Sequence, residues 1–176
     1  MLHLLQNDIS DTPLSIAADI YTTQFVRVNG KFKLNDFNRC HFMYWNITSN
    51  TETCPYIYLD YNAGTFRSPE EYRYSLQSEQ IDTYSFGNIL YVLLTETDPF
   101  EKIEEEKGAT FAKDLVKRGI TPQLGDEFDQ SSDPSVKALV HAMKMCQIYD
   151  WKSRPLTSTI RDYLKDAITN ISSYTS

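Results

Sequence analysis

The chain has few cysteines and no long apolar run. Its three cysteines, Cys40, Cys54 and Cys146, lie far apart, without the paired spacing of a zinc site or a disulfide framework. No stretch reaches the roughly twenty apolar residues that span a bilayer, and Met1 is not followed by the pattern of a signal peptide. These absences argue against a disulfide-stabilised secreted protein and against a membrane span, and they favour a reducing, cytoplasmic (intracellular) setting.

Positive charge is also scarce. The sequence holds 17 Lys and Arg against 24 Asp and Glu, which gives a formal net charge of −7. General binders of nucleic acids or lipid surfaces carry clustered Lys and Arg instead. The composition therefore predicts no nucleic-acid partner.

Length and patterning predict one domain over residues 1–176. With 41% hydrophobic residues the chain is long enough to bury a core. Helical and strand-like patterns both occur, so we expect an α+β fold that is predominantly α-helical. Its central element is the helix 81–94, whose second half is apolar on every side, as in a helix that is buried all round. Asp98-Pro99 predicts the end of this element, because the residue before a proline avoids helical angles.

A β-hairpin is predicted around Asn29-Gly30. The flanking runs 24–28 and 31–34 are strand-like, and a two-residue Asn-Gly link suits a turn in which both residues have positive φ. Regular pattern then disappears from residue 36 to residue 70. A structureless run of this length within a compact domain is usually functional or mobile.

Three helices are predicted after the central one. The first, near 109–118, ends at a basic pair followed by Gly119. The second starts with Pro134 at its first position, and the third starts at Thr157 or Ser158. Residues 172–176 are expected to fray. One apolar face of the last helix follows the helical period: Ile160, Tyr163, Leu164, Ala167, Ile168 and Ile171.

Five short markers occur between residues 17 and 155, and their order is informative. They are Ala17-Ala18-Asp19 followed by Gln24; Leu34-Asn35-Asp36-Phe37-Asn38; Ser68-Pro69-Glu70; Asp82-Thr83-Tyr84-Ser85-Phe86-Gly87; and Asp150-Trp151-Lys152-Ser153-Arg154-Pro155. Their order and spacing resemble the catalytic loop, the metal-binding segment, the end of the activation segment, the central helix and the late Asp-x-x-x-Arg-Pro of protein kinases. The resemblance covers only the C-terminal lobe of that family.

The resemblance implies ATP-dependent phosphoryl transfer to a Ser, Thr or Tyr hydroxyl of a protein, with ATP and magnesium as cofactors. Asp19 is implied as the catalytic residue, which accepts the proton of the substrate hydroxyl. Asp36 is implied as a metal ligand, and Gln24 stands where the family has a metal-ligating Asn. Glu70 and Arg154 are implied to form a buried structural ion pair. The implied partner is a protein substrate or another bound protein.

Several positions depart from the family. The His and Arg before the catalytic acid are Ala17 and Ala18, so a phosphate on the activation segment would lack its usual Arg partner. Tyr21 stands where the family often has Lys. Asn38 replaces a glycine, although Asn tolerates the positive φ that the glycine allows. Nothing in residues 1–18 resembles the glycine-rich loop, Lys and Glu of the family's N-terminal β-rich lobe.

Two functions follow from this pattern. One is a diverged protein kinase whose first half lies outside this sequence, inactive as an isolated chain because half of the nucleotide pocket is missing. The other is a pseudokinase-like binding or scaffold module without phosphotransfer. The residues at 17, 18, 24 and 38 favour the second, whereas the two retained acids at 19 and 36 favour the first. An unrelated small helical protein is the third alternative, if the ordered markers are coincidental.

Overall fold

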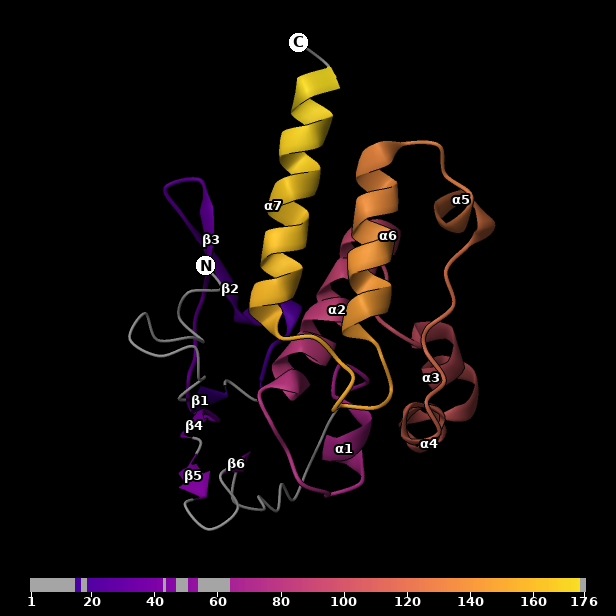
Figure 1. The fold of residues 1–176 in the computed structure, drawn as a ribbon. Helices are drawn as coiled ribbons and strands as arrows, with labels where there is room; N and C mark the ends of the chain where they lie inside the picture. The colour runs from indigo at the N-terminus through magenta and orange to yellow at the C-terminus, as the bar shows by residue number, and fades with distance from the viewer. Residues whose placement is uncertain (1–14, 17–18, 43, 47–50, 54–63, 175–176) are drawn as a thin grey trace.

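The computed structural model describes residues 15–16, 19–42, 44–46, 51–53 and 64–174, in which short strands precede a helical body (Figure 1). The predictions for Ala17, Ala18 and Cys54 lie outside these residues. The first elements are β1 (Ser15–Ile16), the 3-10 helix η2 (Thr22–Gln24), β2 (Phe25–Val28), β3 (Lys31–Leu34), β4 (His41–Phe42), β5 (Tyr44–Asn46) and β6 (Thr51–Thr53). The helices are α1 (Pro69–Tyr72), α2 (Gln80–Thr95), α3 (Glu101–Lys107), α4 (Ala109–Lys117), α5 (Asp126–Asp129), α6 (Pro134–Cys146) and α7 (Thr157–Tyr174). This mostly helical arrangement is compatible with the α+β class expected from the sequence.

The predicted hairpin is confirmed. Strands β2 and β3 pair antiparallel, with Phe25 opposite Leu34 and Val28 opposite Lys31. Both turn residues have positive φ, 51° at Asn29 and 76° at Gly30, as the Asn-Gly link requires. Only the end next to the body is buried, because Leu34 packs inside whereas Phe32 is 61% exposed.

The prediction that residues 36–70 lack regular structure is wrong in its described parts. β4 pairs with β1, and β5 pairs with β6, both antiparallel. Helix α1 then begins at Pro69, after Ser68 forms a capping box with Glu71. Strands of two or three residues are too short to display an alternating pattern, so the sequence carried no periodic signal for them.

The central helix α2 spans 16 residues. Its N-terminal two-thirds are enclosed, since Ile81–Ser85 and Gly87–Tyr91 are all buried. Glu96 ends the helix in a left-handed conformation, with φ of 58°, just before the predicted stop at Asp98-Pro99.

The prediction that 81–94 is buried all round is wrong at the C-terminal end, where Leu93 is 66% exposed. Two different clusters cover the two flanks of this end. Ile89 and Val92 pack toward the Asp19 side, whereas Leu90 and Leu94 pack toward α6 and α7. Leu93 falls between these directions at 100° per residue, where neither cluster reaches it.

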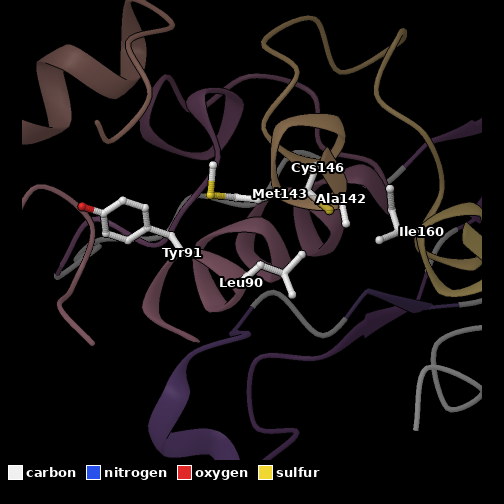
Figure 2. Close-up of a cluster of buried hydrophobic side chains, with 6 residues drawn as sticks. All are labelled: Leu90, Tyr91, Ala142, Met143, Cys146 and Ile160. Atoms are coloured by element: carbon white, nitrogen blue, oxygen red, sulfur yellow. The ribbon is translucent and has the colours of Figure 1, made fainter. Parts of the chain in front are cut away.

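The larger core cluster joins α2, α6 and α7 (Figure 2). Leu90 and Tyr91 come from α2, Ala142, Met143 and Cys146 from α6, and Ile160 from α7. Gly87 lets α2 and α6 approach closely, because a Cβ at this position would lie 2.6 Å from the Cβ of Cys146 and 3.3 Å from the carbonyl oxygen of Met143. Burial raises the pKa of the Cys146 thiol to about 12.

Helix α7 is longer than predicted and less covered. It continues to Tyr174, so residues 172–174, which were expected to fray, are helical. The hydroxyls of Ser172 and Ser173 donate to the carbonyl oxygens of Ile168 and Asn170 within this end. Figure 1 shows α7 extending beyond α6, and Ile168 on the predicted apolar face is accordingly 65% exposed. Within the described residues, no helix combines the length and apolar character needed to cross a membrane.

Replacing Gly87 by Ala is expected to lower the free energy of unfolding by about 1–3 kcal/mol, because the added methyl group overpacks the α2–α6 contact. Urea denaturation measures this change. Leu93→Ala on the same helix is the control, since Leu93 is 66% exposed and its truncation leaves no cavity. Equal effects of the two substitutions would contradict the close packing at Gly87.

Candidate functional site

Asp19 lies in a pocket of about 400 Å³ whose lining comes from both the N-terminal segment and the helical body. The neighbouring residue Ile20 anchors this segment, because it is 5% exposed and packs with Leu34, Phe66 and Ile89. Asp19 itself is partly exposed at the pocket wall. The lining residues are Asp19, Ile20, Tyr21, Gln24, Arg39, Gly64, Phe66, Arg67 and Ser85.

The structure brings together two of the three predicted site residues. The amide nitrogen Nε2 of Gln24 donates a hydrogen bond of 3.1 Å to Oδ2 of Asp19. The short helix η2 ends at Gln24 and places its side chain back toward Asp19, five residues earlier. Two residues that lie five positions apart in the sequence are therefore in direct contact in the structure.

Arg67 is a residue of the pocket that sequence reasoning missed. Its Nη2 forms an ion pair with Oδ1 of Asp19 at 3.1 Å, across 48 residues of chain. Both carboxylate oxygens of Asp19 thus accept hydrogen bonds, one from Arg67 and one from Gln24. The sequence offered only the i,i+4 spacing of Arg67 and Glu71 as a signal.

Glu71 holds Arg67 from the other side. Nη1 of Arg67 lies 3.3 Å from Oε1 of Glu71, and the backbone N–H and hydroxyl of Ser68 donate to Oε2 of Glu71 at 2.8 and 2.9 Å. Burial raises the pKa of the Glu71 carboxyl above its ordinary value of 4.5, with Arg67 acting in the opposite direction. Glu71 is thus a buried acid that orients a guanidinium toward Asp19.

Arg39 adds a second guanidinium to the lining. Burial lowers the pKa of Arg39 below its ordinary value, and the positive charge of Arg67 lowers it further. Both cations line the same pocket. The pocket therefore holds two Arg side chains around one predicted catalytic acid.

Asp36, the predicted metal ligand, is not among the residues that line this pocket. It is exposed, and its carboxylate accepts hydrogen bonds from the backbone N–H of Asn38 at 3.1 Å and from the Asn38 amide nitrogen at 3.4 Å. Asn38 does not adopt the positive φ that it could tolerate, and the left-handed residue here is Asp36, with φ of 61°. Asp tolerates this conformation, and its carboxylate often accepts a hydrogen bond from the backbone N–H two residues later, as Asp36 does from Asn38.

The residues present do not form a ready magnesium site. Magnesium prefers about six oxygen ligands in near-octahedral geometry, whereas Asp36 lies outside the pocket that contains Gln24. Within the part of the chain that the structure describes, no three His, Cys, Asp or Glu side chains are grouped so as to hold a metal ion. The metal roles of Asp36 and Gln24 therefore stay predictions.

Tyr21, which stands at the family's Lys position, directs its hydroxyl away from Asp19. The hydroxyl donates to Oδ2 of Asp98 at 3.1 Å, and the ring packs edge-on against Phe66 with centroids 4.3 Å apart. Burial and then the Asp98 carboxylate raise the pKa of this phenol. Tyr21 is thus a link between the pocket and the end of the central helix.

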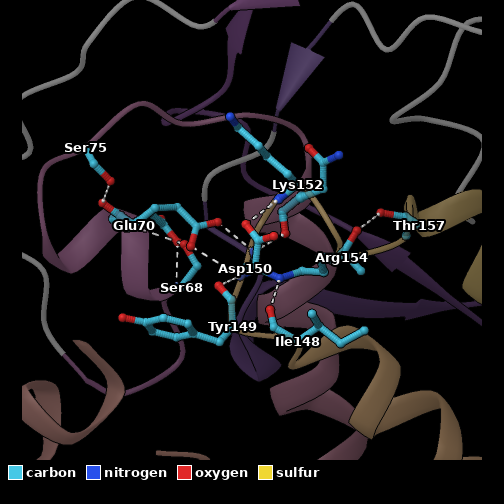
Figure 3. Close-up of polar contacts among 12 residues, drawn as sticks. Ser68, Glu70, Ser75, Ile148, Tyr149, Asp150, Lys152, Arg154 and Thr157 are labelled. Atoms are coloured by element: carbon cyan, nitrogen blue, oxygen red, sulfur yellow. Dashed lines mark hydrogen bonds and ion pairs between the residues drawn. The ribbon is translucent and has the colours of Figure 1, made fainter. Parts of the chain in front are cut away.

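The predicted structural pair of Glu70 and Arg154 is confirmed (Figure 3). Nη1 and Nη2 of Arg154 bind the two carboxylate oxygens of Glu70 at 2.6 and 3.2 Å. The same guanidinium donates to the backbone oxygens of Ile148, Tyr149 and Gln80. Arg154 is 2% exposed, so this bidentate pair is desolvated on all sides.

A second polar link fixes the wall of the Asp19 pocket to the helical body. The side-chain amide of Asn88 in α2 donates to the carbonyl oxygen of Phe66 at 3.0 Å. Gln147, just after α6, donates in turn to Oδ1 of Asn88 at 2.8 Å. All three residues are buried, so the position of the Phe66-Arg67 backbone depends on α2 and α6.

Comparison with known proteins gives two partial matches to protein kinases. The chain is 30% identical over 97 residues to a probable serine/threonine-protein kinase of Dictyostelium discoideum, over 55% of this chain and 6% of that protein. It is 29% identical over 108 residues to an inactive serine/threonine-protein kinase of Arabidopsis thaliana, over 57% of this chain and 32% of that protein. No protein-family model matches the chain. These matches indicate a kinase-like relationship, and the chain spans no more than about a third of either relative's length.

Replacing Arg154 by Met is expected to lower the free energy of unfolding by about 3–5 kcal/mol, because it leaves the Glu70 carboxylate buried without its partner. Thermal or urea denaturation measures the loss. Arg161→Met is the matched control, since Arg161 pairs with Asp162 at the surface and its loss should change stability little. A comparable loss in both variants would argue against a structural role specific to the buried pair.

The raised pKa of Glu71 predicts a pH dependence of stability. The folded state holds the Glu71 proton more tightly than the unfolded state, so its contribution is fully present below about pH 4.5 and is lost as pH rises through the folded pKa. Glu71→Gln lacks this titration. The unfolding free energy of the wild type should therefore fall relative to that of Glu71→Gln as pH rises from 4.5 toward neutrality.

Glu105→Gln is the control for this measurement, because Glu105 is exposed on α3. Urea denaturation of the three proteins across the pH range gives the comparison. A constant difference between the wild type and Glu71→Gln would show that burial does not raise this pKa.

Proposed function

We propose that this chain is the C-terminal lobe of a protein kinase-like domain and that it acts as a pseudokinase-like binding module, without phosphotransfer of its own. The observation that carries the proposal is the ion pair between Arg67 and Asp19. The two partial matches support the kinase-like part, and the Arabidopsis protein carries the word inactive in its name.

The hydrogen bonds that the Asp19 carboxylate already accepts support the absence of phosphotransfer. A general base must reach the proton that it accepts, at roughly 2.6–3.2 Å between heavy atoms. Here Oδ1 of Asp19 contacts Arg67 and Oδ2 contacts Gln24, so both oxygens already serve as acceptors within the chain. A substrate hydroxyl would have to use a remaining lone pair on an oxygen that already accepts from Arg67 or Gln24.

The buried surroundings of Arg67 also support this function. Arg67 is 8% exposed and is held by Glu71, which Ser68 fixes through two further hydrogen bonds. Moving Arg67 away from Asp19 would break a charge-assisted contact in a partly desolvated place, where such contacts are stronger than at the surface. These contacts therefore favour a pocket in which Arg67 stays paired with Asp19.

Phosphotransfer remains the second candidate, and the contact between Gln24 and Asp19 favours it. In the family that the chain resembles, the catalytic acid and a metal-binding amide lie together in this way, and Gln24 and Asp19 share one pocket at 3.1 Å. On this account the substrate hydroxyl approaches a lone pair of Asp19 that neither Arg67 nor Gln24 uses.

Titration with Mg-ATP tests whether this chain binds nucleotide by itself. If the chain is a binding module that does not bind nucleotide, its melting temperature in millimolar Mg-ATP should equal that in magnesium alone. A nucleotide at a hundred times its dissociation constant would add about 2.7 kcal/mol, which corresponds to a rise of roughly 5–10 °C for a domain of this size.

A rise in melting temperature that is abolished by both Asp19→Asn and Asp36→Asn would contradict the proposal and favour phosphotransfer. Glu105→Gln controls for a general effect of removing a negative charge, because Glu105 is exposed and lies outside the pocket. A rise that survives all three substitutions would also contradict the proposal, since it would indicate nucleotide binding elsewhere in the chain.

A further inference from the structure

A second cavity, of about 570 Å³, opens where the end of α2, the start of α3 and the segment between α4 and α5 meet. Its volume is in the range of sites that bind small ligands or peptide side chains. It shares no lining residue with the Asp19 pocket. In Figure 1, α3, α4 and α5 lie together on one side of the helical body, and we call this cavity the α3–α5 groove.

The floor of the α3–α5 groove is apolar. Tyr91 and Phe100 are 8% and 6% exposed, and Leu124 and Phe128 are half-buried beside them. The Tyr91 hydroxyl donates to the carbonyl oxygen of Gln123 at 3.2 Å, so the one polar atom of that side chain is already satisfied. This floor therefore offers mainly ring and methyl surface to an incoming side chain.

The mouth of the groove adds exposed apolar surface. Ile120 lines the groove and is 45% exposed. Burying an exposed aliphatic side chain such as this one is favourable by about 25 cal/mol per Å² of apolar area. An apolar side chain from a partner would gain contact both with Ile120 and with the floor.

The rim of the groove is acidic. Asp98, Glu101 and Glu127 line it against one cation, Lys102, so three negative charges and one positive charge give a net charge of −2. Among the described residues, none of these three carboxylates forms an ion pair, although Asp98 accepts the Tyr21 hydroxyl. The Glu127 carboxylate lies close over Gly125, at the edge of the cavity. The rim thus has negative charge available to a cationic ligand.

We propose that the α3–α5 groove binds a segment of a partner protein in which bulky apolar side chains are flanked by Lys or Arg. The apolar side chain would enter the floor, and the cations would lie against Glu101 and Glu127 at the rim. Charge complementarity selects this partner, because an acidic rim repels phosphates of nucleic acids and lipids and attracts cationic segments. This inference holds whether or not the Asp19 pocket transfers phosphate.

The test measures binding of a short fluorescein-labelled peptide, with a Leu-Leu pair flanked on both sides by Arg-Arg, to the full 176-residue chain by fluorescence polarisation. Two further peptides replace the Leu pair by Ser-Ser or each Arg by Glu. We expect the first peptide to bind at low ionic strength, and both changed peptides to bind at least about tenfold more weakly.

Two variants of the chain locate the site. Glu101→Lys combined with Glu127→Lys reverses the rim charge and should weaken binding of the first peptide about tenfold or more. Glu105→Lys combined with Glu106→Lys makes the same change in net charge on exposed residues of α3 outside the groove, and should change affinity by no more than about twofold. Ile120→Ser tests the apolar contact without altering charge and should also weaken binding.

Several outcomes would overturn the proposal. They are failure of the wild-type chain to bind the first peptide, equal loss in the two charge-reversal variants, or tight binding of the peptide that carries Ser in place of Leu.

Sedimentation of the chain alone tests a competing occupant. Self-association that Glu101→Lys with Glu127→Lys abolishes would assign the groove to a second copy of this chain. Circular dichroism of each variant ensures that a loss of binding is not a loss of fold.

Discussion

The buried guanidinium of Arg154 is the constraint on which the helical body depends. A charge removed from water costs several kcal/mol unless partners surround it, and Arg154 finds its partners in separate segments. It binds the Glu70 carboxylate of α1, the Gln80 carbonyl at the start of α2, and the carbonyls of Ile148 and Tyr149 before α7. These segments must converge on one point for the charge to be buried at all.

Helix α1 connects the Arg154 ion pair to the Asp19 pocket. In α1, Glu70 faces Arg154, whereas the next residue, Glu71, turns back to Ser68 and Arg67. Arg67 in turn reaches Asp19. The ion pair between Arg67 and Asp19 is thus linked, through the neighbouring residues Glu71 and Glu70 of α1, to the ion pair with Arg154. That pair is the most buried one of the described chain. This connection helps to hold the segment that carries Asp19 against the helical body.

The two cavities differ in the sign of the charge that they offer. The Asp19 pocket contains two guanidinium groups, from Arg39 and Arg67, whereas the α3–α5 groove carries a net negative rim. The hydrogen bond from Tyr21 to Asp98 joins a residue of the first cavity to a residue of the second. A chain with these features is suited to holding partner segments at fixed places, which is the function proposed for it.

The sequence by itself determined what local rules govern: the Asn29-Gly30 hairpin, whose turn needs positive φ at both residues, and the existence of the central, α4, α6 and α7 helices. The resemblance of the ordered markers to the kinase family also implied the Glu70–Arg154 ion pair, which exists. Only the tertiary structure decided that Leu93 is exposed, that Asp36 lies outside the Asp19 pocket, and that Arg67 pairs with Asp19. The physical reason is that exposure and ion pairing depend on which distant segments pack alongside a residue, and no pattern of neighbouring residues records a partner 48 positions away.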